Sequence, residues 1–233
     1  MAADRLKELF DGQEETALRW RTSSAAERVA RIERLLAAIR GCREELLQAA
    51  AADFNRPAAE VRLTELVSVT HEAKLAIRKT ASWMRLRHRA PTLVGFGTSA
   101  AVRPEPRGRS LIISPWNYPY SLSFGPLISA LAAGCPVVLK PSEITPHHSR
   151  AIGRIVREVF PPAEVLVVEG DATVAQALCE LPFDHIFFTG STAIGKRVMA
   201  SAARNLSSVT LELGGKSPVI VDSSADQIGR AHV

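Results

Sequence analysis

The sequence of 233 residues predicts an α/β fold: a doubly wound parallel sheet, preceded by helices and a hairpin arm. From Ala2 to about Arg89, apolar residues recur every three or four positions, as they do along one face of an α-helix. After Gly108 the pattern changes, and short apolar runs alternate with helical segments. Such an alternation is typical of buried parallel strands that are covered by helices on both faces.

The composition is that of an ordinary globular protein. Hydrophobic residues make up 46% of the chain and charged residues 23%, which excludes disordered, collagen-like and disulfide-scaffold proteins. The three cysteines, Cys42, Cys135 and Cys179, are widely spaced, and the N-terminus lacks the apolar core of a signal peptide. We therefore expect a cytoplasmic protein. No apolar stretch reaches the roughly 18 residues that a membrane span needs.

Residues 1–90 are predicted to be a helical segment, with Thr22 and Ser23 as capping residues before the second helix. The net charge of +5 arises in residues 1–107, and no acidic residue lies between Lys74 and Arg103. This basic cluster is compatible with a nucleic-acid footprint, but we favour a solvated helix end, because cations are favourable in a last helical turn. We expect no nucleic-acid partner.

Residues 91–107 are predicted to form an extended hairpin or arm, since prolines and glycines there flank a short alternating run. Residues 108–226 are predicted to form the sheet. The expected strands are residues 110–113, 136–139, 164–168, 185–188 and 208–211, and the expected helices are residues 120–133, 147–159, 172–179 and 193–203. In such sheets ligands bind beyond the carboxyl ends of the strands.

One strand end carries an ambiguous motif. The run from Gly190 to Arg197 nearly matches the phosphate-binding loop G-x-x-x-x-G-K-[ST], and Val219–Asp222 resembles the acidic strand that would hold magnesium. Arg197, however, has no hydroxyl to bind the metal. Backbone N–H groups at a helix N-terminus could still bind a pyrophosphate without magnesium. A dinucleotide therefore suits this segment better than a triphosphate, and no metal site is predicted.

Four further segments each have an ordinary structural explanation, such as a helix cap, a surface lysine or a strand-end acid. They are Trp116-Asn117-Tyr118-Pro119, Leu139-Lys140-Pro141-Ser142-Glu143, Phe188-Thr189-Gly190-Ser191-Thr192 and Leu211-Glu212-Leu213-Gly214-Gly215-Lys216-Ser217-Pro218. In this order they resemble the cofactor-domain motifs of NAD(P)-dependent aldehyde dehydrogenases. The resemblance covers roughly residues 5–226 and is greatest to the class 3 branch of fatty and coniferyl aldehyde dehydrogenases. It implies a Rossmann-like cofactor domain.

The resemblance implies a role for each matching residue. Asn117 would be the oxyanion donor, and Glu212 would be the general base that activates water. Lys140 and Glu143 would bind the adenine ribose, with Ser142 alongside. The remaining cofactor-binding positions would be Ser114, Trp116, Gly190, Ser191, Gly195, Leu213 and Gly214. The cofactor would be NAD or NADP, with NAD modestly favoured because Glu143 would repel a 2′-phosphate.

The family oxidises an aldehyde to a carboxylic acid through a cysteine thiohemiacetal and thioester, and its nucleophile lies in a Gly-Gln-x-Cys motif that does not occur here. We therefore expect an inactive N-terminal fragment of an enzyme whose complete form is a homodimer. The alternatives are a stand-alone dinucleotide-binding or scaffold fragment and, third, a P-loop-like nucleotide hydrolase. One codon choice for residues 228–233 matches a common sequencing adapter, so we expect residues 227–233 to be non-native.

Overall fold

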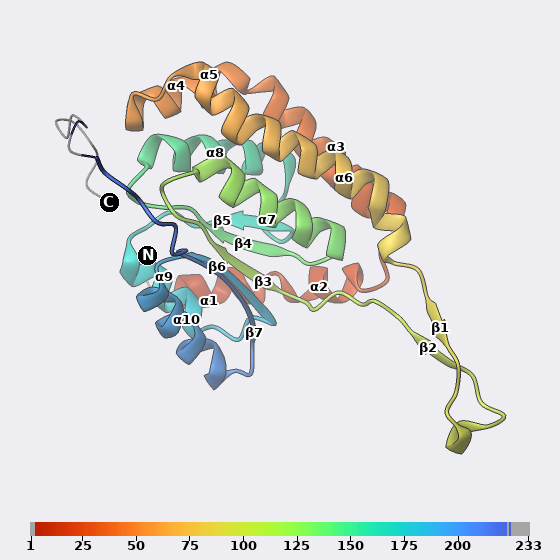
Figure 1. The fold of residues 1–233 in the computed structure, drawn as a ribbon. Helices are drawn as coiled ribbons and strands as arrows, with labels where there is room; N and C mark the ends of the chain where they lie inside the picture. Colours follow the sequence, from red (N-terminus) through yellow and green to blue (C-terminus); the bar gives the residue numbers. More distant parts are fainter. Residues whose placement is uncertain (1–2, 223, 225–233) are drawn as a thin grey trace.

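The computed structural model describes residues 3–222 and 224, and its centre is the predicted parallel sheet (Figure 1). The five strands are β3 (Ser110–Ile113), β4 (Val137–Lys140), β5 (Val165–Val167), β6 (His185–Gly190) and β7 (Ser208–Leu213). Their order across the sheet is β5-β4-β3-β6-β7, and every neighbouring pair is parallel. The predicted fold class is confirmed, and all carboxyl ends lie at one edge. The strand order reverses between β3 and β6.

Helices cover both faces of the sheet. On one face lie α7 (Pro119–Ala133) and α8 (Pro146–Val159), and outside them α3 (Ala25–Gly41), α4 (Arg43–Phe54) and α6 (Val67–Trp83) (Figure 1). The other face carries α1 (Ala3–Asp11), α9 (Ala172–Glu180) and α10 (Thr192–Arg204). Successive side chains of β3 alternate between the two cores, Ile112 in one and Leu111 and Ile113 in the other. The near-continuous apolar pattern of the strands follows from this double burial.

The remaining helical elements connect these layers. They are α2 (Glu14–Trp20), the short α5 (Ala58–Val61) and a π-helical turn, η1 (Arg62–Leu66). The long helix α3 is capped by Ser24, and not by Thr22 or Ser23 as predicted. Ser24 is extended, its hydroxyl accepts from the Glu27 backbone N–H at 3.3 Å, and the Glu27 carboxylate accepts from the Ser24 backbone N–H at 2.7 Å. This reciprocal capping box satisfies two backbone donors at once.

A buried arginine ties the N-terminal helices to the sheet layer. Arg28 on α3 is 5% exposed and donates to the carbonyl oxygens of Ala132 and Ala133, at 3.2 and 2.6 Å, and thus satisfies the C-terminal end of α7. At the same place Gly134 has φ +83°, and a Cβ there would lie 2.7 Å from the Arg28 guanidinium carbon. Only glycine combines that backbone conformation with that close approach.

The arm is a two-stranded antiparallel ribbon that projects away from the body (Figure 1). Its strands are β1 (Arg87–Arg89) and β2 (Ala100–Val102), joined through a 3₁₀ turn, η2 (Leu93–Gly95). Because α6 ends at Trp83, the first strand lies within the stretch for which a helix was predicted. At the tip Leu93, Val94 and Phe96 are 93%, 100% and 91% exposed.

The C-terminal part departs from one expectation. Val219–Asp222, which was interpreted as an acidic strand, has no regular secondary structure, and Val219 and Ile220 are 84% and 95% exposed. The proposed non-native residues 227–233 lie outside the described part of the chain. None of the helices in the described ranges is long and apolar enough to cross a membrane.

Candidate cofactor and catalytic site

Two adjoining cavities lie at the carboxyl edge of the sheet, on either side of the point where the strand order reverses. One, of about 570 Å³, is lined by Asn117, Glu212 and Glu72, and the other, of about 840 Å³, by Lys140 and Glu143. Residues from the loop after β3 and from the end of β6 with the residue that follows it line both cavities: Pro115, Trp116, Thr189, Gly190 and Ser191. An extended ligand could therefore reach from one cavity into the other, at the place where open α/β sheets bind nucleotides.

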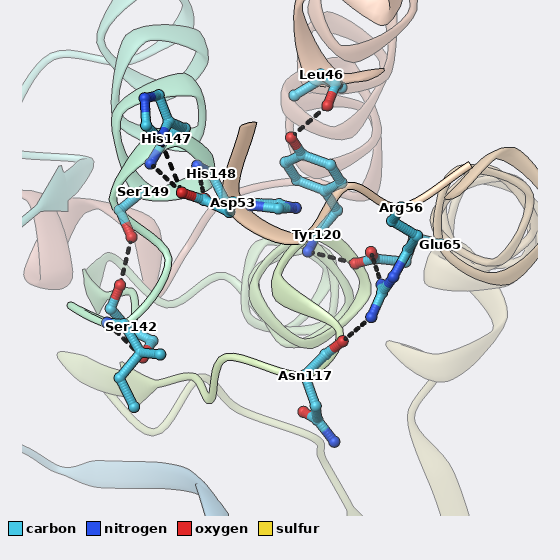
Figure 2. A network of polar contacts seen from close by, with 11 residues as sticks. Leu46, Asp53, Arg56, Glu65, Asn117, Tyr120, Ser142, His147, His148 and Ser149 are labelled. Carbon is cyan, nitrogen blue, oxygen red and sulfur yellow. Dashed lines mark hydrogen bonds and ion pairs between the residues drawn. The ribbon is translucent and has the colours of Figure 1, made fainter. Parts of the chain in front are cut away.

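Asn117 lies in the turn between β3 and α7, with both of its oxygen atoms engaged. Its backbone oxygen accepts from Arg56 at 2.9 Å, and its side-chain Oδ1 accepts from the Tyr118 backbone N–H at 3.0 Å. The side chain points away from Arg56 (Figure 2). Among the described residues Nδ2 donates to none, so this group is available to donate a hydrogen bond to a ligand in the smaller cavity.

Glu212 and Glu72 bring two carboxylates to the same cavity. Glu212 lies near the end of β7, the edge strand, and is exposed. Glu72 extends from α6, and burial raises the pKa of its carboxyl group. A Cβ at Gly125 on α7 would lie 2.4 Å from Glu72 Oε2, so a larger residue there would displace this carboxylate. The sequence analysis missed Glu72, because one acid in an amphipathic helix looks like an ordinary surface residue.

Lys140 and Glu143 form an ion pair at the wall of the larger cavity. The Lys140 side chain is only 3% exposed, and its Nζ lies 2.5 Å from Glu143 Oε2. Partial burial alone would raise the pKa of Glu143, but the hydrogen bond and the charge of Lys140 together lower that pKa below its ordinary value. Glu143 is therefore ionised at neutral pH. The pair presents a cation and an anion to one ligand, which suits a group with neighbouring hydroxyls.

The segment after β6 does not form a phosphate-binding loop of the P-loop type. Only Ser191 separates β6 from α10, so Thr192–Gly195 are helical and cannot wrap around a phosphate. Ser191 caps the helix by accepting from the Ile194 backbone N–H at 3.4 Å. The unpaired N–H groups of this helix N-terminus, next to the larger cavity, can still bind an anion.

Two predicted cofactor-binding residues do not reach either cavity. Ser142 is buried, and its hydroxyl accepts from the Ile144 backbone N–H at 3.3 Å, so it stabilises the turn after β4. Gly195 lies within the first turn of α10, where a Cβ would meet Leu213 Cδ2 at 2.8 Å. Gly195 therefore permits the close packing of α10 against β7. Ser114, Trp116, Gly190 and Ser191 line the larger cavity, and Leu213 and Gly214 the smaller.

No thiol lies beside Asn117 and Glu212. Cys135 and Cys179 are buried, and Cys42 lies at the junction of α3 and α4, outside both helices. Cys179 contacts the larger cavity, but burial raises its pKa to about 11, which makes it a poor nucleophile at neutral pH. Within the described residues there is also no group of three or more His, Cys, Asp or Glu side chains placed to hold a metal ion.

A feature of the structure that does not depend on the sequence motifs, the hydroxyl group of Thr189, also fits a bound dinucleotide. Thr189 Oγ1 is buried and makes no hydrogen bond to any residue that the structure describes, and Thr189 lines both cavities. A buried hydroxyl without a partner is costly unless a ligand or water satisfies it. Because Thr189 belongs to the walls of both cavities, a ligand that spans them would pass it.

An open parallel sheet with a double cavity across its reversal point defines a nucleotide-binding α/β domain. The chain belongs to the aldehyde dehydrogenase family, whose model matches residues 2–231. It is 41% identical over 199 residues to aldehyde dehydrogenase family 3 member H1 of Arabidopsis thaliana, covering 85% of this chain and 41% of that protein. It is 38% identical over 227 residues to coniferyl aldehyde dehydrogenase of a Pseudomonas species, covering 97% and 47%.

Solved structures show the same likeness. The substrate-bound state of Staphylococcus aureus AldH matches with a TM-score of 0.88 at 37% identity, over 94% of this chain and 48% of that one. Mycobacterium tuberculosis aldehyde dehydrogenase complexed with NAD+ matches with a TM-score of 0.83 at 28% identity, over 93% and 45%. The chain thus spans about half the length of the curated relatives it matches.

Proposed function

We propose that this chain is the cofactor-binding part of an NAD(P)-dependent aldehyde dehydrogenase, which in complete form oxidises an aldehyde to a carboxylic acid. One observation carries the proposal: Asn117 and Glu212 share a cavity that adjoins the cavity of Lys140 and Glu143, and Thr189, with its unsatisfied hydroxyl, lines both. The similarity to Mycobacterium tuberculosis aldehyde dehydrogenase complexed with NAD+ supports a dinucleotide as the ligand.

Each residue has a distinct task in this proposal. Lys140 and Glu143 bind the ribose hydroxyls of the adenosine half, while Ser191 and the α10 N-terminus lie against the pyrophosphate. Asn117 Nδ2 donates to the aldehyde oxygen as negative charge develops there, and a neutral amide can do so at any physiological pH. Glu212, exposed at the strand end, takes a proton from the hydrolytic water. When bound, NAD(P)+ supplies the hydride acceptor.

The chain itself is proposed to bind cofactor without turnover, because its three cysteines do not reach Asn117 and Glu212. The exposed apolar tip of the arm supports a homodimer as the form of the complete enzyme. The three unpaired cysteines favour a cytoplasmic location.

Calorimetric titration of the full chain with NAD+ tests the binding step. We expect saturable binding that Lys140→Met weakens by about tenfold, because a charge-assisted contact is lost. Lys196→Met is the matched control, since Lys196 is exposed on α10 and lines neither cavity. Absence of binding at millimolar NAD+ contradicts the proposal.

A parallel assay tests the expected lack of turnover. We expect no NADH formation from an aldehyde with the purified chain. Turnover that Glu212→Gln abolishes, in protein free of contaminating dehydrogenase, would show that the chain is catalytically complete.

A further inference from the structure

An ion pair between Arg56 and Glu65, which lies outside the cavity, holds the turn that carries Asn117. None of the sequence motifs includes these two residues. Arg56 follows α4 and is 15% exposed on its side chain, whereas Glu65 in η1 is fully buried. Arg56 Nη1 lies 3.0 Å from Glu65 Oε1 (Figure 2). Neither residue lines either cavity, so neither can touch a ligand there.

Glu65 caps α7 from a distant segment. The N-cap residue of α7, Tyr118, makes no side-chain capping bond, and Pro119 has no N–H. Glu65 Oε2 instead accepts from the backbone N–H groups of Tyr120 and Ser121, at 2.7 and 3.3 Å. A carboxylate at this end also interacts favourably with the helix dipole. The start of α7 is thereby fixed relative to η1.

Arg56 connects this cap to Asn117. While Nη1 pairs with Glu65, Nη2 donates to the Asn117 backbone oxygen at 2.9 Å, and the guanidinium lies 5.2 Å from the centre of the Tyr118 ring. The planar guanidinium can make both bonds at once, which a lysine ammonium cannot do with the same geometry. The backbone from Asn117 to the start of α7 is therefore constrained.

We propose that Arg56 and Glu65 are positioning residues that fix the Asn117 side-chain amide toward the smaller cavity. This inference concerns the same site as the proposed function, and the catalytic importance of Arg56 and Glu65 rests on that function. With the Asn117 backbone oxygen held by Arg56 and Oδ1 held by the Tyr118 N–H, Nδ2 is left as the group presented to the ligand. Loss of the ion pair frees the turn and lets the amide rotate.

The test uses the amide itself as the signal. The sequence contains three asparagines, Asn55, Asn117 and Asn205, so the chain labelled with ¹⁵N-asparagine gives three side-chain NH₂ pairs. Loss of one pair in Asn117→Asp assigns the signal. Asn205 at the end of α10 is an internal control, because general loosening of the fold would move its signal as well.

In Arg56→Gln we expect the Asn117 pair to shift or broaden while the Asn205 pair keeps its position. Arg56→Lys should shift the Asn117 pair by an intermediate amount, since a single ammonium replaces the guanidinium group that bonds both Glu65 and Asn117. Arg62→Gln is the matched control: Arg62 pairs with Glu44 at 3.5 Å, and no contact joins it to the Asn117 turn. An unshifted Asn117 pair in folded Arg56→Gln overturns the proposal. If Arg56→Gln does not fold, the Asn117 pair is compared in Arg56→Lys and Glu65→Gln, and an unshifted pair in both overturns the proposal.

A second readout separates this inference from the proposed function. In the proposed function Asn117 contacts the aldehyde and not the cofactor, so Arg56→Gln should change the dissociation constants of NAD+ and of ADP-ribose by less than about twofold. Weakening of both ligands by about tenfold or more contradicts a role confined to the Asn117 turn. If the wild-type chain binds neither ligand, the proposed function fails, but the Asn117 signal, which needs no ligand, still tests the positioning role.

Discussion

The Lys140–Glu143 pair predicts a preference for NAD+ over NADP+ that a single substitution should reduce. A 2′-phosphate bound by Lys140 would lie within about 5 Å of the Glu143 carboxylate, because the two side chains are 2.5 Å apart. The Glu143 side chain is 41% exposed, so an effective dielectric constant of about 40 to 80 applies. With a phosphate charge of about −1.5, the repulsion is then about 1 to 2.5 kcal/mol, or roughly a 5- to 60-fold ratio of affinities.

Glu143→Gln removes this charge and keeps a carbonyl oxygen that can accept from a ribose hydroxyl. Calorimetry at low ionic strength gives the dissociation constants of NADP+ and NAD+. The ratio of the NADP+ constant to the NAD+ constant should fall by roughly 5- to 60-fold in Glu143→Gln. This fall should be smaller at high salt, because salt screens the repulsion. Glu169→Gln is the control, since Glu169 is equally exposed, pairs with Arg157 at 3.9 Å and lines neither cavity. A ratio that changes no more in Glu143→Gln than in the control refutes the electrostatic reasoning.

Three further predictions concern stability, each measured by urea unfolding. Arg28→Met should lower the free energy of unfolding by about 2 to 4 kcal/mol, because it leaves buried carbonyl groups unpaired. Arg21→Met is the control, and it should change this free energy very little because Arg21 is exposed. Gly134→Ala should cost about 1 to 3 kcal/mol because of its positive φ, and an unchanged midpoint would contradict this. Burial lowers the pKa of His148, so the unfolded chain binds this proton at a higher pH than the folded chain does. The free energy of unfolding should therefore decline as pH falls below about 6.5, and it should decline less steeply in His148→Gln.

The sheet and the four helices that cover it directly were predictable, because doubly buried strands consist of apolar runs that few other structures require. The same signal failed at Val219–Asp222, where the apolar residues are exposed and the segment is not a strand. An apolar run thus indicates a strand only where neighbouring elements bury it. At Gly190–Lys196 the motif resembled a loop, but the segment is helical from Thr192 because Ser191 caps a helix there.

The parts of the site that the sequence did not reveal depend on contacts between distant segments. Arg56 reaches Asn117 across 61 positions, and Glu65 reaches Tyr120 across 55. A local sequence pattern cannot indicate contacts between segments so far apart in the chain. Arg56 and Glu65, taken singly, look like residues of an exposed helical surface. Glu72 is similar, since its place at the cavity follows only from the packing of α6 on α7. The strand-end residues were found because the topology of a parallel sheet brings them together.

The contacts that join the first helices to the sheet also determine when this chain can fold. Gln13 donates to the Val137 backbone oxygen across 124 positions, and Arg28 reaches α7 across 104 and 105. At about 5 to 20 residues per second, a ribosome needs roughly 6 to 25 s to make the segment between Gln13 and its partner. During that interval the apolar faces of α1 to α6 have no sheet layer to pack on. They must be protected by chaperones or by one another until α7 and β4 emerge.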